Sequence, residues 1–287
     1  MIGSLRHIAP GAQNPFSIVE NPRMEETMEE ATSAFGDYLG RGDKMRELID
    51  HMSTALTKTC RPDGAAISII GESGTGKELI AQALHQRRSL GGVFVHADGA
   101  TTGSTELFGR TDLDVHVGAT SRKGAIPRAE RGTLYVENVE RLSQRTQRSL
   151  LRFVETRQPE EPGGAIVGEP MPTVLVVVSS ERSLAESVRS GNLLASLAYA
   201  VGGYTVSAPP LRDCEPRHVK MLADIFLKQA CERTGRSQKA FDQAAYEFIF
   251  SHRLGGNGDE LASIIMRGSI HDELVVSAAD LEQACRH

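Results

Sequence analysis

A glycine-rich segment between an apolar run and a helical pattern is the part of this sequence best suited to chemistry. It consists of Gly71, Glu72, Ser73, Gly74, Thr75, Gly76 and Lys77, with Glu78 directly after it. Glycines let backbone N–H groups turn inward around an anion, and the N-terminus of a following helix adds a favourable dipole. Lys77 would place a positive charge on the outer phosphates. The order of strand, loop, lysine and helix therefore predicts a phosphate-binding loop and a nucleotide ligand.

The elements that position this loop alternate between strands and helices. Strands are predicted at 65–70, 93–96, 133–137, 174–178 and 204–206. Such alternation indicates a parallel α/β sheet, and a fully apolar strand such as 174–178 is typical of its middle. From residue 215 onward the pattern is helical only, and helices are expected near 216–234, 238–252, 257–270 and 278–286. The fold class is therefore α/β, with a central parallel sheet flanked by helices and a small α-helical lid after it.

We expect three parts along the chain. Residues 1–34 are polar and weakly periodic, and they are interpreted as an N-terminal tail. Residues 35–213 would form the nucleotide-binding α/β subdomain, beginning with a helix at 35–59 and containing a Pro- and Gly-rich loop at 158–172. Residues 214–287 would form the helical lid.

The composition is that of an ordinary globular protein. The chain has 287 residues, of which 40% are hydrophobic and 24% charged, and its net charge of −5 gives no general reason to expect nucleic-acid binding. It has no run of 18 apolar residues and no signal-peptide pattern at its start, so we expect a cytoplasmic protein without a membrane segment. The four cysteines are scattered and form no CxxC pair, and no metal-binding motif is present.

Five motifs in order carry a family resemblance. They are GESGTGKE at 71–78, ELFG at 106–109, GTLYV at 132–136, PPLR at 209–212, and Gly256-Asn257 with Glu260-Leu261. Together they resemble the AAA+ ATPase domain of bacterial enhancer-binding proteins, which activate sigma-54 RNA polymerase, and the resemblance spans residues 38 to 285. It implies a P-loop AAA+ core with a helical lid, and ATP or ADP with Mg²⁺ as the ligand. The family also has a glutamate after the lysine, so Glu78 fits its pattern.

The acidic pair of the family is altered. After the strand at 133–136 the family has Asp-Glu, whereas this chain has Glu137-Asn138. The first carboxylate of the family holds Mg²⁺ through water, and Glu137 could do so with a longer arm or be a vestigial acid at the strand end. The second is the general base, and the amide of Asn138 cannot take that proton. Loss of a positioned base typically costs ~10²–10⁴ in rate.

A third position of the catalytic group also differs. The family has an asparagine at the end of the preceding strand, which restrains the catalytic glutamate, and Asp98 falls near that place. Two interpretations follow: Asp98 is a substitute base, or it is a surface residue of the turn at 97–99. We favour the turn.

Other departures concern turnover and the contact with sigma factor. The two arginines that the family inserts into a neighbouring subunit's nucleotide are Leu194 and Ala200 here, and the lid arginine that senses the γ-phosphate is Asp259. Arginine fingers are worth ~10³–10⁵ in turnover in GTPases. Arg189 lies nearby and is interpreted as a solvated helix residue. The sigma-contacting GAFTGA tip of the family falls at 113–118, where its Phe-Thr pair is absent.

These departures predict a degenerate member of the family. The expected function is that of a nucleotide-binding transcription regulator of the sigma-54-activator type, which hydrolyses ATP slowly or not at all. Because no helix-turn-helix is recognised, we expect it to act through protein partners, such as an intact enhancer-binding protein or another regulator, in a homo- or hetero-oligomer. Two alternatives stay open: an active AAA+ NTPase with rearranged catalytic residues in a remodelling role, and a nucleotide-free scaffold.

Overall fold

The computed structural model describes residues 54, 66–88, 91–110, 122–158 and 173–286. The predicted tail at 1–34, nearly all of the predicted helix at 35–59 and the predicted loop beyond residue 158 therefore lie outside the described residues. None of the described helices is both long and apolar enough to cross a membrane.

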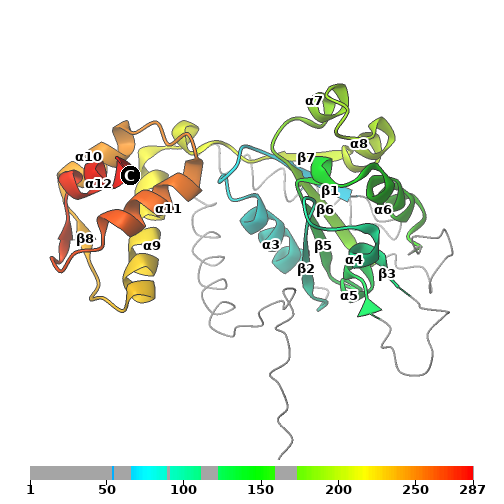
Figure 1. Cartoon of the computed structure of the whole chain (residues 1–287), viewed down its shortest axis with the longest axis horizontal. Helices are drawn as coiled ribbons and strands as arrows, with labels where there is room; N and C mark the ends of the chain where they lie inside the picture. Colours follow the sequence, from blue (N-terminus) through cyan, green and yellow to red (C-terminus); the bar gives the residue numbers. More distant parts are fainter. Residues whose placement is uncertain (1–53, 55–65, 89–90, 111–121, 159–172, 287) are drawn as a thin grey trace, which may run out of the picture.

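A five-stranded parallel sheet forms the centre of the larger part of the molecule, in the order β2-β5-β6-β1-β7 (Figure 1). Its strands are β1 (Ala66–Ile70), β2 (Phe94–Asp98), β5 (Thr133–Glu137), β6 (Leu175–Ser180) and β7 (Tyr204–Ser207). Register is continuous across the sheet: Leu134 of β5 pairs with Val95 of β2 and Val176 of β6, and Ile67 of β1 pairs with Val177. The predicted parallel α/β sheet is confirmed. All five strands end at one edge, which is where parallel sheets place ligands.

Helices cover both faces of this sheet. They are α3 (Lys77–Arg88), α4 (Ser104–Phe108), α5 (Ala125–Arg128), α6 (Gln144–Thr156), α7 (Leu184–Arg189) and α8 (Ala195–Val201), with a 3₁₀ turn η1 (Val139–Arg141) after β5. Side chains alternate between the two faces: Tyr135 and Val177 pack with the residues of α3, whereas Val136 and Val176 pack with those of α6 and α8. Because both faces are covered, the central strands are predominantly apolar, as the sequence predicts for 174–178.

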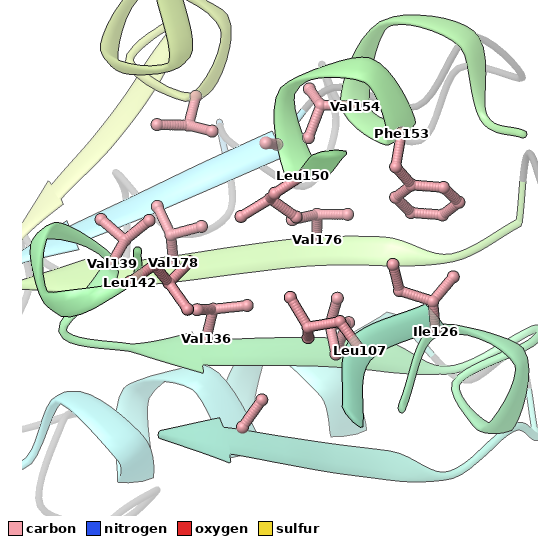
Figure 2. Close-up of a cluster of buried hydrophobic side chains, with 14 of the residues drawn as sticks. Leu107, Ile126, Val136, Val139, Leu142, Leu150, Phe153, Val154, Val176 and Val178 are labelled. Carbon is pink, nitrogen blue, oxygen red and sulfur yellow. The ribbon is translucent and has the colours of Figure 1, made fainter. Parts of the chain in front are cut away.

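The larger of the two sheet-face clusters lies under α6. Figure 2 shows Leu150 and Phe153 of α6 above Val176 of β6, with Leu107 of α4 and Ile126 of α5 completing the layer. All five side chains are fully or almost fully buried. Their positions follow from helical spacing in α6, where an i, i+3 pair presents one apolar stripe to the sheet. This layer fixes the far side of the strands whose ends form the site described below.

A short antiparallel pair of strands flanks residues 111–121, the segment that contains positions 113–118 and that we call the insertion. Strand β3 (Gly109–Arg110) pairs with β4 (Arg122–Lys123). The tip at 113–118 lies outside the described residues.

The C-terminal part is a bundle of four helices joined to the core by a 3₁₀ turn, η2 (Leu211–Asp213). Its helices are α9 (Pro216–Thr234), α10 (Gln243–Ser251), α11 (Asn257–Gly268) and α12 (Ala278–Cys285). The expectation of helices alone is wrong in one place, since β8 (Ala240–Phe241) pairs in parallel with β9 (Val275–Val276). The helix predicted at 238–252 begins only at Gln243, because the Asp242 carboxylate accepts a hydrogen bond from the N–H of Ala245 at 2.7 Å and caps it there.

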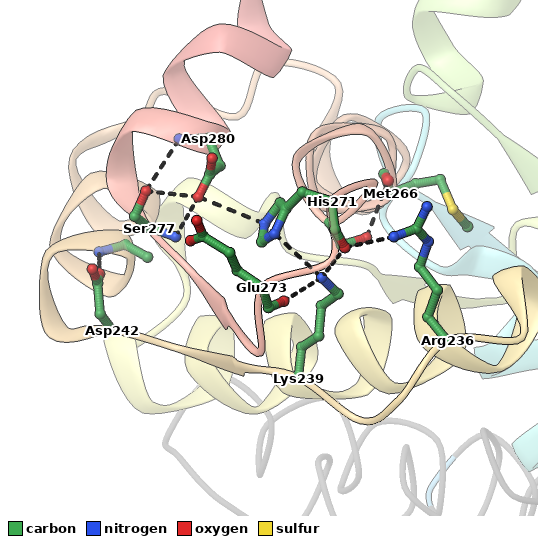
Figure 3. Close-up of polar contacts among 10 residues, drawn as sticks. Arg236, Lys239, Asp242, Met266, His271, Glu273, Ser277 and Asp280 are labelled. Carbon is green, nitrogen blue, oxygen red and sulfur yellow. Dashed lines mark hydrogen bonds and ion pairs between the residues drawn. The ribbon is translucent and has the colours of Figure 1, made fainter.

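A buried lysine holds the strand pair of this bundle together (Figure 3). The ammonium group of Lys239 donates hydrogen bonds to the carbonyl oxygens of His271 and Glu273. Arg236 adds a hydrogen bond to the same His271 carbonyl and an ion pair of 2.7 Å to Asp272. These contacts attach the segment between α11 and α12 to the segment between α9 and α10, which are far apart in sequence.

Candidate nucleotide-binding site

The glycine-rich loop lies between β1 and the N-terminus of α3, at the edge where the strands end. Gly74 and Gly76 have φ angles of 73° and 77°, which side chains rarely allow, and Gly71 leaves no room for a Cβ beside Ala208. The N–H of Gly71 donates to the carbonyl oxygen of Ser180 at 3.1 Å, which ties the loop to β6. The glycines at 71, 74 and 76 are thus required by the backbone path, as expected for a loop that wraps an anion.

Lys77 is buried at the start of α3, and its ammonium group lies over the loop. It donates hydrogen bonds to the carbonyl oxygens of Gly71 at 2.9 Å and Glu72 at 2.8 Å. Burial lowers the pKa of Lys77 from its ordinary value, and the carboxylates of Glu181 and Glu137 oppose that shift. The lysine is therefore poised at the loop, with carbonyl partners that phosphate oxygens can replace.

A cavity of about 350 Å³ opens beside this lysine. The loop from Ser73 to Glu78 and the ends of β5 and β6 form one side of it, and Leu222 and Phe226 of α9 contribute an apolar wall. Phosphates would meet the loop and a nucleobase the apolar wall, so the described residues fit a nucleotide in both parts.

Glu137 and Asn138 both line the cavity, at the end of β5. Asn138 has a left-handed backbone (φ 50°, ψ 58°), and its buried Oδ1 atom has no hydrogen-bond partner among the described residues. The N–H of Asn138 bonds to the Ser179 hydroxyl at 3.4 Å, and that hydroxyl bonds to the buried Tyr135 hydroxyl at 2.9 Å. An amide oxygen without a partner can accept a hydrogen bond from a water or ligand, but it cannot accept a proton at neutral pH.

Glu137 is held by a histidine that sequence reasoning did not identify. The Nε2 atom of His96 lies 3.1 Å from the Glu137 carboxylate, and its Nδ1 atom lies 3.7 Å from the carboxylate of Glu78. The described residues contain no group of three or more His, Cys, Asp or Glu arranged to hold a metal. Carboxylate oxygens suit Mg²⁺, which usually takes one or two of them together with phosphates and water. Glu137 fits that role, with the remaining positions left to ligand and solvent.

Asp98 is placed at the end of β2, in register with Glu137. Its carboxylate accepts hydrogen bonds from the N–H of Ala100 at 2.9 Å and, at 3.5 Å, from the Thr101 hydroxyl. The carboxylate therefore stabilises the turn that follows the strand. This geometry favours the turn interpretation over that of a substitute base.

A polar cluster, which we name the lid latch, connects the glycine-rich loop to the helical bundle. It consists of Glu72, Arg212 and Asn257. Two guanidinium nitrogens of Arg212 donate to the two carboxylate oxygens of Glu72, at 2.6 and 2.7 Å. The fully buried amide of Asn257 donates to Glu72 at 3.2 Å and to the Ser73 carbonyl at 2.9 Å, and it accepts from the N–H of Leu211 at 2.8 Å. The loop, the connecting turn and the first residue of α11 are thus joined.

The latch makes a testable prediction about pH. Hydrogen bonds from Arg212 and then Asn257 lower the pKa of Glu72 to about 2. A depressed folded-state pKa stabilises the fold above the ordinary value of 4.5, and that stabilisation is lost as the pH falls toward 2. We expect Glu72→Gln to lower the melting temperature by a few degrees at pH 7, with the difference from wild type shrinking between pH 4.5 and 2.

The control for this prediction is Glu232→Gln, which removes an exposed i,i+4 pair with Lys228 and does not involve the loop. We expect a much smaller difference for that variant, because exposed helix pairs contribute little. A Glu72→Gln difference that is the same at pH 7 and pH 2 would contradict the assignment of the latch to the ionised carboxylate.

The three positions at which the family has arginines lie in two separate parts of the structure. Asp259, in the first turn of α11, lines the cavity, and its carboxylate lies about 3.1 Å from where a Cβ on Gly74 would be. Leu194 precedes α8 and Ala200 lies within it, on the side of the sheet away from the lid (Figure 1), and both pack partly against the core. Arg189 ends α7.

Glu181 is a second site residue that sequence reasoning missed. It follows β6 directly and lines the cavity. Its N–H bonds to the Glu140 carboxylate at 3.2 Å, and its own carboxylate lies 3.5 Å from Arg141. Its position in the sequence was the available signal. Glu181 is the first residue after β6, and the strands on either side of β6 lead directly into Gly71 and Asn138.

The architecture of loop, sheet edge and lid agrees with comparison to known families. A family model described as the sigma-54 interaction domain matches residues 38–207, more than half of the chain. The chain belongs to the sigma-54 interaction domain family. The resemblance drawn from the five motifs is thereby confirmed, and the matched residues contain the glycine-rich loop, Glu137, Asn138 and Glu181.

Several curated proteins are similar to this sigma-54 interaction domain protein. The nitrogen fixation protein AnfA of Azotobacter vinelandii is 28% identical over 91% of this chain and 49% of its own length. The DNA-binding transcriptional regulator NtrC of Rhizobium meliloti is 29% identical over 94% of this chain and 55% of its own length. The chain therefore spans about half the length of the curated relatives that it matches.

Solved structures show the same fold. A crystal structure of NtrX from Brucella abortus covers 91% of this chain and 60% of NtrX, with a TM-score of 0.71 and 26% identity. NtrX in complex with ATP covers 93% of this chain and 63% of NtrX, with a TM-score of 0.67 and 25% identity. RuvB of Thermotoga maritima, at 14% identity and a TM-score of 0.55, shares the fold alone. The P-loop AAA+ class predicted for this sigma-54 interaction domain is confirmed.

Proposed function

We propose that this chain is a nucleotide-binding regulator of the sigma-54-activator type, which hydrolyses ATP slowly or not at all and acts through protein partners. The observation that carries this proposal is a complete glycine-rich loop with Lys77, beside a strand end where Asn138 stands at the sequence position at which the family has its general base. We further propose that residues 1–34 are a tail, that residues 35–213 form the nucleotide-binding subdomain, and that residues 214–287 form its lid.

Nucleotide binding is supported by the geometry of the loop and by the relatives. The left-handed glycines, the buried Lys77 and the apolar wall at Leu222 and Phe226 suit phosphates and a base, respectively. NtrX, which is similar along 93% of this chain, has a structure in complex with ATP. Mg²⁺, when bound, would neutralise phosphate charge, and we propose that Glu137, which lines the cavity, would hold it.

Weak ATP turnover is supported by the residue types at the positions where the family has its general base and its arginine fingers. Hydrolysis needs a group that takes a proton from the attacking water, and Asn138 lacks a basic atom. Leu194 and Ala200 cannot supply the charge that arginine would bring to a neighbouring subunit's site. Binding of the nucleotide depends on the loop and Lys77, and these are present. The chain can therefore bind what it does not efficiently cleave.

Action through partners is supported by the family and by the sequence of the insertion. Sigma-54 interaction is the activity for which the family model is named, but residues 113–118 lack the Phe-Thr pair of the sigma-contacting tip. An intact enhancer-binding protein or another transcription regulator, in a homo- or hetero-oligomer, is the partner class we propose. A rearranged active NTPase is the second candidate, and the carboxylate of Glu181 in the cavity is the observation that favours it.

The proposed function is tested by thermal unfolding with nucleotide, beside phosphate release from the same sample. At 100 times its dissociation constant, ATP or ADP should stabilise the wild-type chain by ~2.7 kcal/mol, and Lys77→Ala should lose this effect. Phosphate release should not exceed that of Lys77→Ala by more than a trace. No stabilisation by either nucleotide would overturn nucleotide binding, and fast release that depends on Lys77 would favour the rearranged NTPase.

A further inference from the structure

The charges around the phosphate position are unbalanced. Four carboxylates line the cavity, those of Glu78, Glu137, Glu181 and Asp259, and Lys77 is the one lysine or arginine among the described lining residues. Two arginines lie close to the cavity without lining it. Arg212 makes its two-pronged contact with Glu72 in the lid latch, and Arg141 forms an exposed ion pair of 3.5 Å with Glu181, which offsets the charge of that carboxylate only in part.

Two of these carboxylates approach the loop from opposite elements. Glu181 extends from the end of β6, and Asp259 from the first turn of α11, where it lies against Gly74. The lid is held in that place by the N–H of Gly258, which donates to the carbonyl oxygen of Gly74 at 2.9 Å. The backbone at Asp259 is therefore kept beside the loop as long as the contact between Gly258 and Gly74 persists.

The same two carboxylates interact electrostatically with Lys77, the residue expected to contact the outer phosphates. Glu181 has the largest electrostatic effect on Lys77, Glu137 and Glu140 come next, and Asp259 also contributes, all opposing the lowering of its pKa by burial. A P-loop lysine reaches the outermost phosphates of its nucleotide. An additional terminal phosphate would thus add negative charge where carboxylates already outnumber the cation.

We propose that this cavity selects a nucleoside diphosphate over the corresponding triphosphate, and that Glu181 and Asp259 set the preference. The inference rests on the proposed function, because it names the ligand of the same site. Inner phosphates are bound by uncharged backbone N–H groups of the loop, which both nucleotides use equally. The terminal phosphate is the part that differs, and like charges in a partly desolvated cavity repel it. Glu137 is set apart because it can be neutralised by Mg²⁺.

We expect ADP to bind about tenfold more tightly than ATP to the wild-type chain in EDTA, which corresponds to about 1.4 kcal/mol. Excess Mg²⁺ should reduce the ratio without reversing it, since the metal neutralises part of the phosphate charge of both ligands. Asp259→Asn and Glu181→Gln keep the size of each side chain and remove its charge. Each should tighten ATP severalfold and leave ADP nearly unchanged, and the double variant should reduce the ratio of dissociation constants further, leaving only the preference that Glu78 and Glu137 impose without Mg²⁺.

The measurement is isothermal titration of the full chain with ADP, with ATP and with a non-hydrolysable ATP analogue, so that cleavage cannot distort the comparison. Glu155→Gln, on the exposed side of α6, makes the same charge change away from the cavity and should keep the wild-type ratio. Wild-type protein that binds ATP as tightly as ADP in EDTA would overturn the inference, as would a double variant that keeps the wild-type ratio. Failure of both nucleotides to bind would instead overturn the proposed function.

Discussion

Asn138→Glu is expected to raise phosphate release about a hundredfold over the wild-type chain. Asn138 lines the cavity together with Lys77 and Glu137. A glutamate there would restore a carboxylate able to take the proton of the attacking water, and such bases contribute ~10²–10⁴ in rate. We expect the lower end of that range because the left-handed backbone at 138 suits asparagine better than glutamate. Leu194 and Ala200 leave the absolute rate low even when the base is restored.

The measurement is single-turnover release of labelled phosphate with Mg²⁺-ATP at saturating concentration, so that a preference for ADP does not limit the result. Asn138→Gln is the matched control, since it has the length of glutamate without a basic atom. The combination of Lys77→Ala with Asn138→Glu should return release to background. If Asn138→Glu is no faster than Asn138→Gln, the missing base is not what limits turnover in this chain.

Most of the core could be predicted because its signals are local. The residues from Gly71 to Lys77 are contiguous, and their order with the strand before and the helix after them defines the loop. The strand at 133–137 has the predicted bounds, and the strand predicted at 174–178 differs by one or two residues at each end. A short run of apolar residues is typical of a strand that is covered on both faces, so it predicts such a strand directly. The helix at 216–234 is likewise as predicted, with a proline at its start and a glycine after its end.

The parts that could not be predicted depend on contacts between distant residues. The first residues of the helix predicted at 238–252 are extended because Ala240 and Phe241 pair with Val275 and Val276, some 35 positions away. Helical periodicity in 238–252 contains no information about that partner, and only the cap at Asp242 was local. Periodicity in the sequence therefore overestimates the length of a helix wherever a short strand directly precedes the N-cap residue.

The site shows the same division between local and distant signals. The loop was visible in the sequence, but His96 contacts Glu137 from 41 positions away, and Glu181 reaches the cavity from a different strand. The sequence identifies Glu72 as a loop residue only, whereas its carboxylate binds Arg212, 140 positions later. A motif gives the residues that bind the ligand, while the charges that tune affinity and specificity come from whichever strand ends and helix starts the fold brings to the same edge.

Asn257→Ala is expected to destabilise the chain by about 3 kcal/mol or more and to separate the lid from the loop. The amide of Asn257 is fully buried and serves Leu211, Ser73 and Glu72 at once. Its removal leaves a buried N–H and a carbonyl group without their partners, at ~1–3 kcal/mol for each unsatisfied group. The backbone of residue 257 is also left-handed, with φ 53°, which costs alanine ~1–2 kcal/mol and asparagine less.

Asn257→Gly and Asn257→Asp separate these contributions in denaturant unfolding. Glycine accepts the left-handed backbone and lacks the amide, so it should recover the backbone term and remain destabilised by the lost hydrogen bonds. Aspartate keeps the acceptor for the Leu211 N–H but turns the donor that faces Glu72 into a second carboxylate, and it should weaken the latch most at neutral pH. An Asn257→Gly variant that unfolds at the wild-type denaturant concentration would show that the amide contributes nothing, and the lid would then be held to the loop by other contacts, among them the backbone bond between Gly258 and Gly74.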